Sequence, residues 1–284
     1  MSAAIDAVSS VSTSHVTAEP KAGATATQAI AGETFVITDS AASTDPVAID
    51  IASTVTEGTV NLAVGTTNAQ LSVTGEGTAT LSIGGANDAS GNALDQSGAV
   101  IGIDDSYAGK VVANFSAAYV SSDATVDATA KVGGSTSTIG ENAPAGSVAG
   151  VNLYVNTGTG ADEIGGSDKN DFVRAGAGDD EVNAGSGDDI VRLGVGSDKA
   201  SLGGGDDSLY MTVDQFGDGN VNTVTDFDSS GDDKLLFNND IKGLLTITGQ
   251  GTNTLTLTLS GDNASTVTFT SEGGTFDADD IEFV

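Results

Sequence analysis

Aspartate recurs at a fixed interval in the middle of the chain. Residues 157–210 divide into six consecutive nonads, and the sixth residue of every nonad is Asp. The nonads read TGTGADEIG, GSDKNDFVR, AGAGDDEVN, AGSGDDIVR, LGVGSDKAS and LGGGDDSLY. Their sixth residues are Asp162, Asp171, Asp180, Asp189, Asp198 and Asp207. Neighbouring carboxylates repel one another, so a chain that repeats them in this way is predicted to hold cations between them.

The nine-residue period predicts a coil of strands and turns. An α-helix repeats its faces about every 3.6 residues, whereas a nonad fits a short strand joined to a tight turn. Two nonads make one coil of 18 residues, so the sixth positions of alternate nonads should stack about 4.8 Å apart in two columns. The first column is Asp162, Asp180 and Asp198, and the second is Asp171, Asp189 and Asp207. The eighth residue of each nonad is apolar and should point into a thin core: Ile164, Val173, Val182, Val191, Ala200 and Leu209.

Glycine and aspartate together predict a particular cation. Glycine holds the second position in five of the six nonads and the fourth in five of the six. Glycine tolerates positive φ and exposes backbone carbonyls in tight turns, and calcium takes about six to eight oxygen ligands in a flexible geometry. We therefore predict several Ca²⁺ ions, held by the sixth-position aspartates and the turn glycines. Asp179 and Asp188, the first residues of their Asp pairs, should face solvent or add to the field. The predicted glycine positions are Gly158, Gly160, Gly176, Gly178, Gly185, Gly187, Gly194, Gly196, Gly203 and Gly205.

The nonads resemble the RTX repeats, whose pattern is G-G-x-G-x-D-x-U-x. The resemblance covers residues 157–210 and implies a calcium-binding parallel β-roll. The extension NTVTDFDSSGDDKLLF is similar to the segment that follows RTX repeats, and it adds Asp226 and Asp233 to the predicted metal ligands. Two nonads depart from the pattern: Ser167 and Lys169 stand where glycine is expected, and Ala200 is small for an inward position. Sites that use those two turns are expected to be weaker or empty.

The RTX resemblance also implies export from a Gram-negative cell by type I secretion, with an uncleaved C-terminal signal. Residues 280–284, DIEFV, look like such an ending and are equally typical of a last strand. The first residues lack the basic and apolar regions of an ordinary secretory signal peptide, which fits this route. The chain is therefore expected outside the cell, where millimolar calcium would fold the acidic repeats.

Composition excludes several classes of partner. The 284 residues include 40 Asp and Glu against 9 Lys and Arg, a formal net charge of -31. Such a surface repels nucleic acids and anionic membranes. The chain has no Cys, so disulfides, a thiolate nucleophile and cysteine metal ligands are all excluded. It also lacks a run of about 20 apolar residues, so no membrane span is expected.

The remaining segments predict an all-β protein. Residues 1–32 are small and polar and should form an arm or tail. Residues 33–150 contain short alternating runs such as TVNLAVGT and TATLSIGG, separated by turn residues, which favour an antiparallel β-sandwich-like assembly domain. GKVVANFSAAYVS could be a strand or a short helix. The β-roll is expected over 155–212, followed by a β-rich C-terminal segment over 213–284 that carries the secretion signal.

The sequence gives little support for an enzyme. A zinc protease needs H-E-x-x-H, and the single histidine, His15, lies in the N-terminal arm. A serine hydrolase needs a histidine base that the chain does not offer. A carboxylate pair could hydrolyse glycosides, but the chain has no Trp and only four Tyr to form sugar platforms. We expect no catalytic residues.

Two non-enzymatic functions remain. The chain resembles calcium-dependent S-layer proteins in being acidic, cysteine-free, rich in Thr, Ala and Gly, and almost entirely β. This resemblance implies a secreted structural protein that assembles with itself into a surface lattice or filament. Its expected partners are further copies of itself, the type I secretion machinery and a cell-surface polysaccharide bound through calcium. The alternative is a calcium-dependent adhesin or ligand-binding module that does not polymerise.

Overall fold

A computed structural model describes most of the chain from residue 27 onwards. The described residues are 27–29, 34–37, 46–88, 90–104, 107–115, 125–127, 129–130, 139–141, 143–144, 147–217, 219–227, 232–260 and 265–284. The arm predicted over residues 1–32 and His15 therefore lie outside the described residues, except for 27–29.

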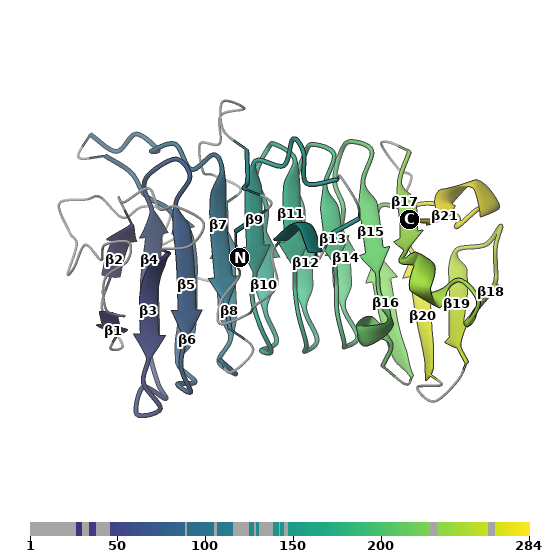
Figure 1. Ribbon diagram of the computed structural model, residues 1–284, viewed down its shortest axis with the longest axis horizontal. Helices are drawn as coiled ribbons and strands as arrows, with labels where there is room; N and C mark the ends of the chain where they lie inside the picture. The colour runs from purple at the N-terminus through teal and green to yellow at the C-terminus, as the bar shows by residue number, and fades with distance from the viewer. Residues whose placement is uncertain are drawn as a thin grey trace.

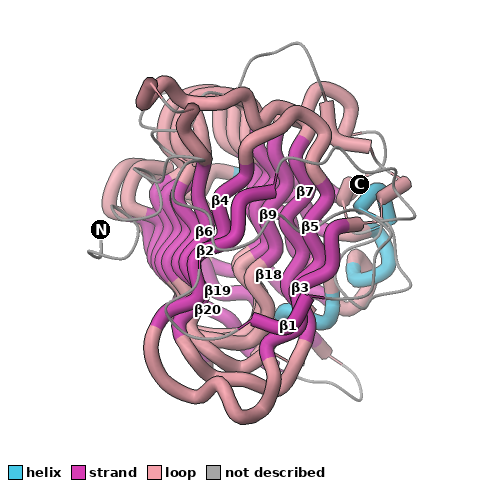
Figure 2. The backbone as a smooth tube through the Cα atoms, turned by 90° about the vertical axis from the view of Figure 1, so that its left-hand side faces the viewer, coloured by secondary structure: helices cyan, strands magenta, loops and turns pink. Residues whose placement is uncertain are grey.

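Two β-sheets face each other along the described length of the molecule. Strands stand side by side along the long axis (Figure 1), and the view from the β1 and β2 end shows two separate stacks (Figure 2). The ten-stranded sheet contains, in spatial order, β1 (Thr27–Ala29), β3 (Val47–Ile51), β5 (Gln70–Thr74), β7 (Ala99–Ile103), β9 (Leu153–Asn156), β11 (Asp171–Arg174), β13 (Ile190–Arg192), β15 (Ser208–Met211), β17 (Lys234–Phe237) and β21 (Ile281–Phe283). The eleven-stranded sheet contains β18 (Leu245–Thr248), β19 (Thr254–Leu259), β20 (Ser265–Ser271), β16 (Asn220–Val224), β14 (Lys199–Ser201), β12 (Glu181–Asn183), β10 (Glu163–Gly165), β8 (Val111–Asn114), β6 (Thr80–Gly85), β4 (Thr59–Val64) and β2 (Thr34–Ile37).

The chain winds as a parallel β-roll. From β1 to β17 successive strands lie in opposite sheets, and each strand from β1 to β15 pairs in parallel with the strand two places later in the sequence. The predictions of an all-β fold and a parallel β-roll are confirmed. Within the described residues the only helices are short 3₁₀ turns: η2 (Ile139–Glu141), η3 (Val213–Gln215), η4 (Asn239–Ile241) and η5 (Ala278–Asp280).

The antiparallel pairing predicted for residues 33–150 is wrong. The pairs β2–β4, β4–β6, β6–β8, β3–β5 and β5–β7 are all parallel and belong to the same two sheets as the nonads. Alternating apolar residues show only that a strand has one buried face, which a sandwich and a roll share. Of GKVVANFSAAYVS, residues Val111–Asn114 form strand β8, and residues 116–121 lie outside the described part.

Antiparallel pairing occurs where the eleven-stranded sheet ends. β18 pairs with β19 and β19 with β20 in antiparallel register, and β20 then joins the roll parallel to β16. The alternating threonines of TLTLTL and STVTFTS turn outward while the leucines of β19 and Val267 and Phe269 of β20 are buried. At the same end of the molecule, β21 is the last strand of the ten-stranded sheet.

Apolar side chains fill the space between the sheets. All six eighth-position residues of the nonads are buried there, as predicted, and Phe227, Phe269 and Phe276 close the C-terminal end of this core. A second cluster covers the outer face of the ten-stranded sheet, where Tyr154 and Phe172 meet edge to face with ring centroids 5.1 Å apart. Each large apolar side chain buried in this way contributes about 1.5–3 kcal/mol. Among the described residues, no helix is long and apolar enough to cross a membrane.

The parallel register can be tested by cross-linking, because the chain has no native cysteine. Thr59 of β4 lies beside Thr80 of β6. Neighbouring strands place Cα atoms within disulfide range. The double variant Thr59→Cys/Thr80→Cys should therefore form an intramolecular disulfide under mild oxidation, measured by mass spectrometry. Thr59→Cys/Thr74→Cys, whose residues lie in different sheets, is the control. Equal cross-linking of both pairs would contradict the register.

Candidate metal centre

The six sixth-position aspartates form two columns along opposite edges of the roll. Asp162, Asp180 and Asp198 come directly before β10, β12 and β14, which pair in parallel in the eleven-stranded sheet. The other three stand at the starts of β11, β13 and β15 in the ten-stranded sheet. All six are buried. The predicted columns are therefore present, with the predicted members.

Each column is a ladder of hydrogen bonds between coils. The backbone N–H of Asp162 donates to Oδ1 of Asp180 at 2.8 Å, and that of Asp180 donates to Oδ1 of Asp198 at 3.0 Å. In the second column, Asp171 N–H donates to Asp189 Oδ1 and Asp189 N–H to Asp207 Oδ1, both at 2.8 Å. Because each step spans 18 residues, one Oδ1 per coil fixes the register of the next coil.

The second carboxylate oxygens distinguish a metal site from a structural ladder. Oδ2 is buried and has no hydrogen-bond partner in five of the six residues, among the described part of the chain. A buried polar atom left unpaired costs about 1–3 kcal/mol, and more if it is charged. Repeating that cost along both columns is unfavourable unless a cation supplies the missing partner. The five residues are Asp162, Asp180, Asp189, Asp198 and Asp207.

The electrostatics of the columns agree with this reading. Burial raises the pKa of Asp180 to about 8 and that of Asp189 to about 9, and the carboxylates of adjacent coils raise both further. Burial likewise raises the pKa of the other four to about 7. In the absence of a cation, the column carboxyl groups therefore tend to stay protonated. A divalent cation would lower their pKa values again by pairing with the ionised carboxylates.

The turn glycines allow the coils to stack closely. Nine of the ten predicted glycines have positive φ, Gly160 being the exception. A Cβ on Gly194 would lie 1.7 Å from the carbonyl oxygen of Gly176, one coil away, and a Cβ on Gly196 equally close to that of Gly178. Only glycine fits here. Among the described residues, no three Asp, Glu or His side chains converge on one point. An ion between turns would therefore draw on backbone carbonyls as well as carboxylates, which suits calcium.

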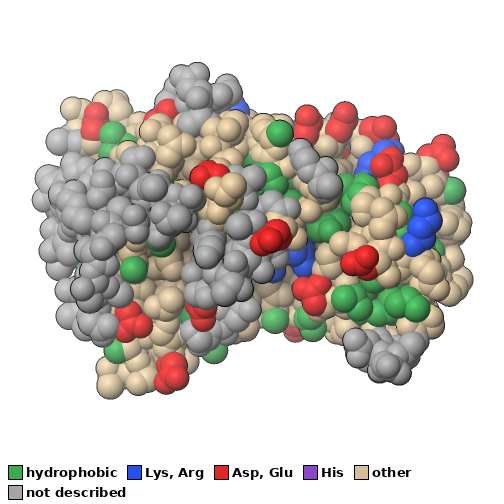
Figure 3. Space-filling model, in the orientation of Figure 1, with side chains coloured by type: hydrophobic (Ala, Val, Ile, Leu, Met, Phe, Trp, Pro, Cys, Tyr) green, Lys and Arg blue, Asp and Glu red, His purple; other side chains and the backbone are tan. Residues whose placement is uncertain are grey.

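A second ladder runs outside the first. Asp179, Asp188 and Asp206 are exposed, as expected for the first Asp of each pair. Asp188 Oδ1 accepts the backbone N–H of Asp206 at 3.0 Å, and Asp179 Oδ1 accepts that of Ser197 at 2.9 Å. Figure 3 shows acidic side chains gathered along the upper edge, toward the β17 end of the molecule. These residues add negative potential around the buried columns and tie the turns together.

The turn of residues 167–171 differs from the others. Ser167 donates to Asp171 from its backbone N–H at 2.5 Å and from its hydroxyl at 2.9 Å. Asp171 therefore has no unpaired oxygen, which separates it from the other five column aspartates. The prediction of a weaker site in this turn stays a prediction. Ala200, the other departure, is fully buried in the core position of its nonad.

The ends of the columns include one residue that the sequence did not reveal. Asn222 Oδ1 accepts the N–H of Asp198 at 3.0 Å and so takes the next place in the first column. Asp233, which was predicted as a metal ligand, takes the same place in the second column by accepting the N–H of Asp207 at 3.1 Å. Asp226 lies outside both columns, where its carboxylate accepts hydrogen bonds from Ser201 Oγ and from the N–H groups of Leu202 and Gly203.

Comparison with known protein families gives a match over the nonad region. Residues 156–191 and 183–210 match the sequence model of the RTX calcium-binding nonapeptide repeat. The nonads are RTX repeats, and they bind calcium. The matched region is the one that holds both aspartate columns, so several Ca²⁺ ions belong to this part of the chain. Calcium would supply the positive charge that the column carboxylates lack, and it would take oxygen ligands from these aspartates and from turn carbonyls.

Two further comparisons add less. The solution structure of the AlgE6R3 subunit of the Azotobacter vinelandii mannuronan C5-epimerase is similar at 23% identity. The match has a TM-score of 0.31 and covers 45% of this chain and 77% of that one. No curated protein matches the sequence.

Asp189 and Asp188 form a matched pair for testing the site. Asp189→Asn keeps the shape of a buried column residue but removes its charge, whereas Asp188→Asn changes an exposed neighbour. Changes outside the immediate ligand shell already cost metal sites about tenfold or more in affinity. We expect Asp189→Asn to raise the calcium midpoint of folding by at least about tenfold and Asp188→Asn to change it much less. The measurement is circular dichroism during a calcium titration, and equal midpoints for the two variants would contradict the assignment.

Calcium binding should release protons near neutral pH. The pKa values of the column aspartates are raised in the calcium-free fold, from 3.8 to about 8 for Asp180 and about 9 for Asp189. A raised pKa means that the calcium-free fold gains stability as pH falls from about 9 towards about 4 and loses it as pH rises. Calcium needs the ionised form, so its affinity should rise with pH from about 6 to 9. Calorimetry in buffers of different ionisation enthalpy measures the proton release, and none at pH 7 would contradict the raised values.

Proposed function

We propose that this chain is a secreted calcium-binding structural protein that assembles with itself at the cell surface, as the subunit of an S-layer lattice or an extracellular filament. The observation that carries the proposal is that, among the described residues, both sheets have an edge strand with one unpaired side at each end of the roll. Calcium would fold the RTX repeats after export and so make the subunit competent to assemble.

The sheet ends support head-to-tail association. Within the described residues, β1 and β2 each pair on one side only, and so do β18 and β21 at the opposite end. An edge strand offers a row of backbone donors and acceptors to another chain. An interface between two different ends is heterologous, and it generates an open filament or a lattice row wherever the rotation between copies does not close a ring.

Charge makes this association calcium-dependent. A net charge of -31 repels copies of the chain from one another. Divalent ions in the two columns neutralise part of that charge and order the coils that separate the two ends of the roll. A cell-surface polysaccharide could be held in the same way, through calcium shared with the exposed Asp179, Asp188 and Asp206.

Export and the absence of catalysis belong to the same proposal. RTX repeats are typical of exported proteins, and we assign export to type I secretion, with residues 280–284 in the C-terminal signal. In the fold, these residues include strand β21, beside β17. The sequence contains neither H-E-x-x-H nor a G-x-S-x-G elbow served by a histidine base, so we assign no enzymatic activity.

A groove favours the second candidate, an adhesin that does not polymerise. It has a volume of about 410 Å³ and crosses β8, β10, β12 and β14. Its lining includes the polar side chains of Asn114, Glu163, Glu181, Asn183 and Lys199. A mixed polar lining of this kind suits a hydroxyl-rich ligand. The two candidates differ in whether calcium produces growth or only a compact monomer.

Light scattering during a calcium titration of calcium-stripped protein separates these functions. The proposal predicts growth at millimolar calcium, reversal by chelator, and regular lattices or filaments by electron microscopy. Compaction without growth would reject self-assembly and favour the adhesin. Magnesium at the same concentration is the control for simple charge screening, since it binds poorly to flexible, carbonyl-rich sites.

A further inference from the structure

Both arginines of the chain lie side by side. The sequence contains two arginines, Arg174 and Arg192, and parallel register pairs them on β11 and β13. Their chain neighbours Val173 and Val191 point into the core, so both arginines lie on the outer face of the ten-stranded sheet. Adjacent strands are about 4.8 Å apart, so the backbones that carry the two cationic side chains are close together. In a protein of net charge -31, this is an unusual concentration of positive charge.

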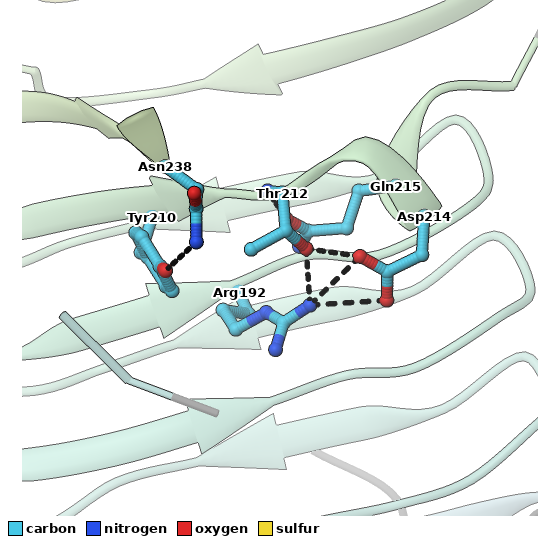
Figure 4. A network of polar contacts seen from close by, with 6 residues as sticks. All are labelled: Arg192, Tyr210, Thr212, Asp214, Gln215 and Asn238. Carbon is cyan, nitrogen blue, oxygen red and sulfur yellow. Dashed lines mark hydrogen bonds and ion pairs between the residues drawn. The ribbon is translucent and has the colours of Figure 1, made fainter. Parts of the chain in front are cut away.

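Arg192 is held in a fixed position by its surroundings (Figure 4). Its Nη2 donates to the Thr212 hydroxyl at 2.7 Å and pairs with Asp214 Oδ2 at 3.2 Å. The guanidinium also lies over the Tyr210 ring, 5.6 Å from the centroid. Gln215 Oε1 accepts the backbone N–H of Thr212 at 2.7 Å and so braces the turn that carries Asp214. Only 4% of Arg192 is exposed, so its charge is largely removed from water.

Arg174 has no equivalent network. Its side chain makes no hydrogen bond or ion pair with the residues that the structure describes, and it is partly exposed. Burial works against ionisation of Asp214, but the Thr212 hydroxyl and then the charges of Arg192 and Arg174 hold the pKa of Asp214 below its ordinary value. Asp214 is thus one anion acting on two cations. Together, Arg174, Arg192 and Asp214 carry a net charge of +1.

A small hollow is lined by both arginines and by the neighbouring turns. Its volume is about 50 Å³. One water molecule needs about 10–15 Å³ by a comparable measure, so the hollow has room for a small polyatomic group. The lining residues that matter here are Arg174, Arg192, Gly176, Gly194, Asp214 and Gln215.

We propose that the Arg174–Arg192 pair is a binding site for a single carboxylate group. A guanidinium presents parallel N–H donors that match the two oxygens of a carboxylate. One carboxylate would neutralise the surplus charge, whereas a doubly charged sulfate or phosphate would leave a negative charge beside Asp214. The partly exposed Arg174 makes the primary contact, and Arg192, which is held by its hydrogen bonds, sets the geometry. The site lies on the outer sheet face and does not depend on the self-assembly proposed above.

The carboxylate belongs either to a soluble compound or to an acidic side chain of a second copy. The test uses calcium-loaded, ¹⁵N-labelled protein, in which only two arginine Nε–H resonances are expected. Potassium acetate is titrated at constant ionic strength against potassium chloride. The expected result is a saturable acetate-specific shift of the Arg174 resonance, accompanied by shifts of the Gly176 and Gly194 amides.

Three variants make the test specific. Arg174→Gln should weaken acetate binding by about tenfold or more, since it removes a charge-assisted hydrogen bond. Arg174→Lys keeps the charge without the planar fork and should give an intermediate loss. Lys199→Gln, which removes a cation from the eleven-stranded sheet, should bind acetate like the unaltered chain. Circular dichroism in calcium confirms that each variant is folded.

Sedimentation then distinguishes the two sources. Calcium-dependent association that Arg174→Gln and acetate both weaken would support a carboxylate from a second copy. Acetate binding without any change in mass would support a soluble carboxylate. Identical, unsaturable shifts with acetate and chloride, or shifts that persist unchanged in Arg174→Gln, would overturn the site. Calcium binding is measured separately in each variant, so failure of this site leaves the calcium assignment unaffected.

Discussion

Buried aspartate is the constraint on which the RTX part of this structure depends. Five of the six column carboxylates accept a backbone hydrogen bond from the adjacent coil with one oxygen and keep the other oxygen buried and without a partner among the described residues, whereas Asp171 accepts from Ser167 with both. The first oxygen fixes the register of stacked coils, and the second calls for a cation. Without calcium, burial raises the pKa values of the column carboxyls to about 7 to 9. Ionisation of these groups near neutral pH therefore destabilises the calcium-free fold. Calcium pairs with the ionised carboxylates, and its binding free energy contributes to folding.

The surrounding features follow from the need to stack these coils closely. Glycines with positive φ let the carbonyl of one turn approach the next turn to a distance that no Cβ would allow. The coils before the nonads solve stacking differently: strands β3 to β8 are held by buried Val, Ile and Leu and carry no such columns. One roll therefore joins two kinds of coil, and β8 connects them, since Val111 N–H donates to Oδ1 of Asp162 at 2.7 Å. The apolar coils offer a preformed edge on which the calcium-dependent coils can form.

The sequence predicted the columns because an 18-residue repeat translates directly into spatial register. It missed Asn222 because the coil there is longer: the contact from Asp198 to Asn222 spans 24 residues, and that from Asp207 to Asp233 spans 26. Asp226 was predicted as a ligand by its place in an acidic segment, but it aligns with Leu202 rather than with the column and caps the following turn. Strand direction in residues 46–114 could not be predicted, because alternating apolar residues define a buried face and say nothing about which strand lies alongside. The arginine pair, in contrast, follows from the repeat itself: Arg174 and Arg192 end alternate nonads, 18 residues apart, so the coil places them side by side.

Hydrogen exchange measured with and without calcium tests the central claim most directly. The amides of Asp162, Asp171, Asp180 and Asp189 donate to carboxylates of the adjacent coil, so their protection reports on the columns themselves. With calcium bound at neutral pH, these amides should exchange slowly. After chelation, protection should be lost across residues 156–210 and kept in β4, β5 and β6, whose core is apolar. Equal protection of the nonads in both conditions would contradict the claim that calcium holds the aspartate columns together.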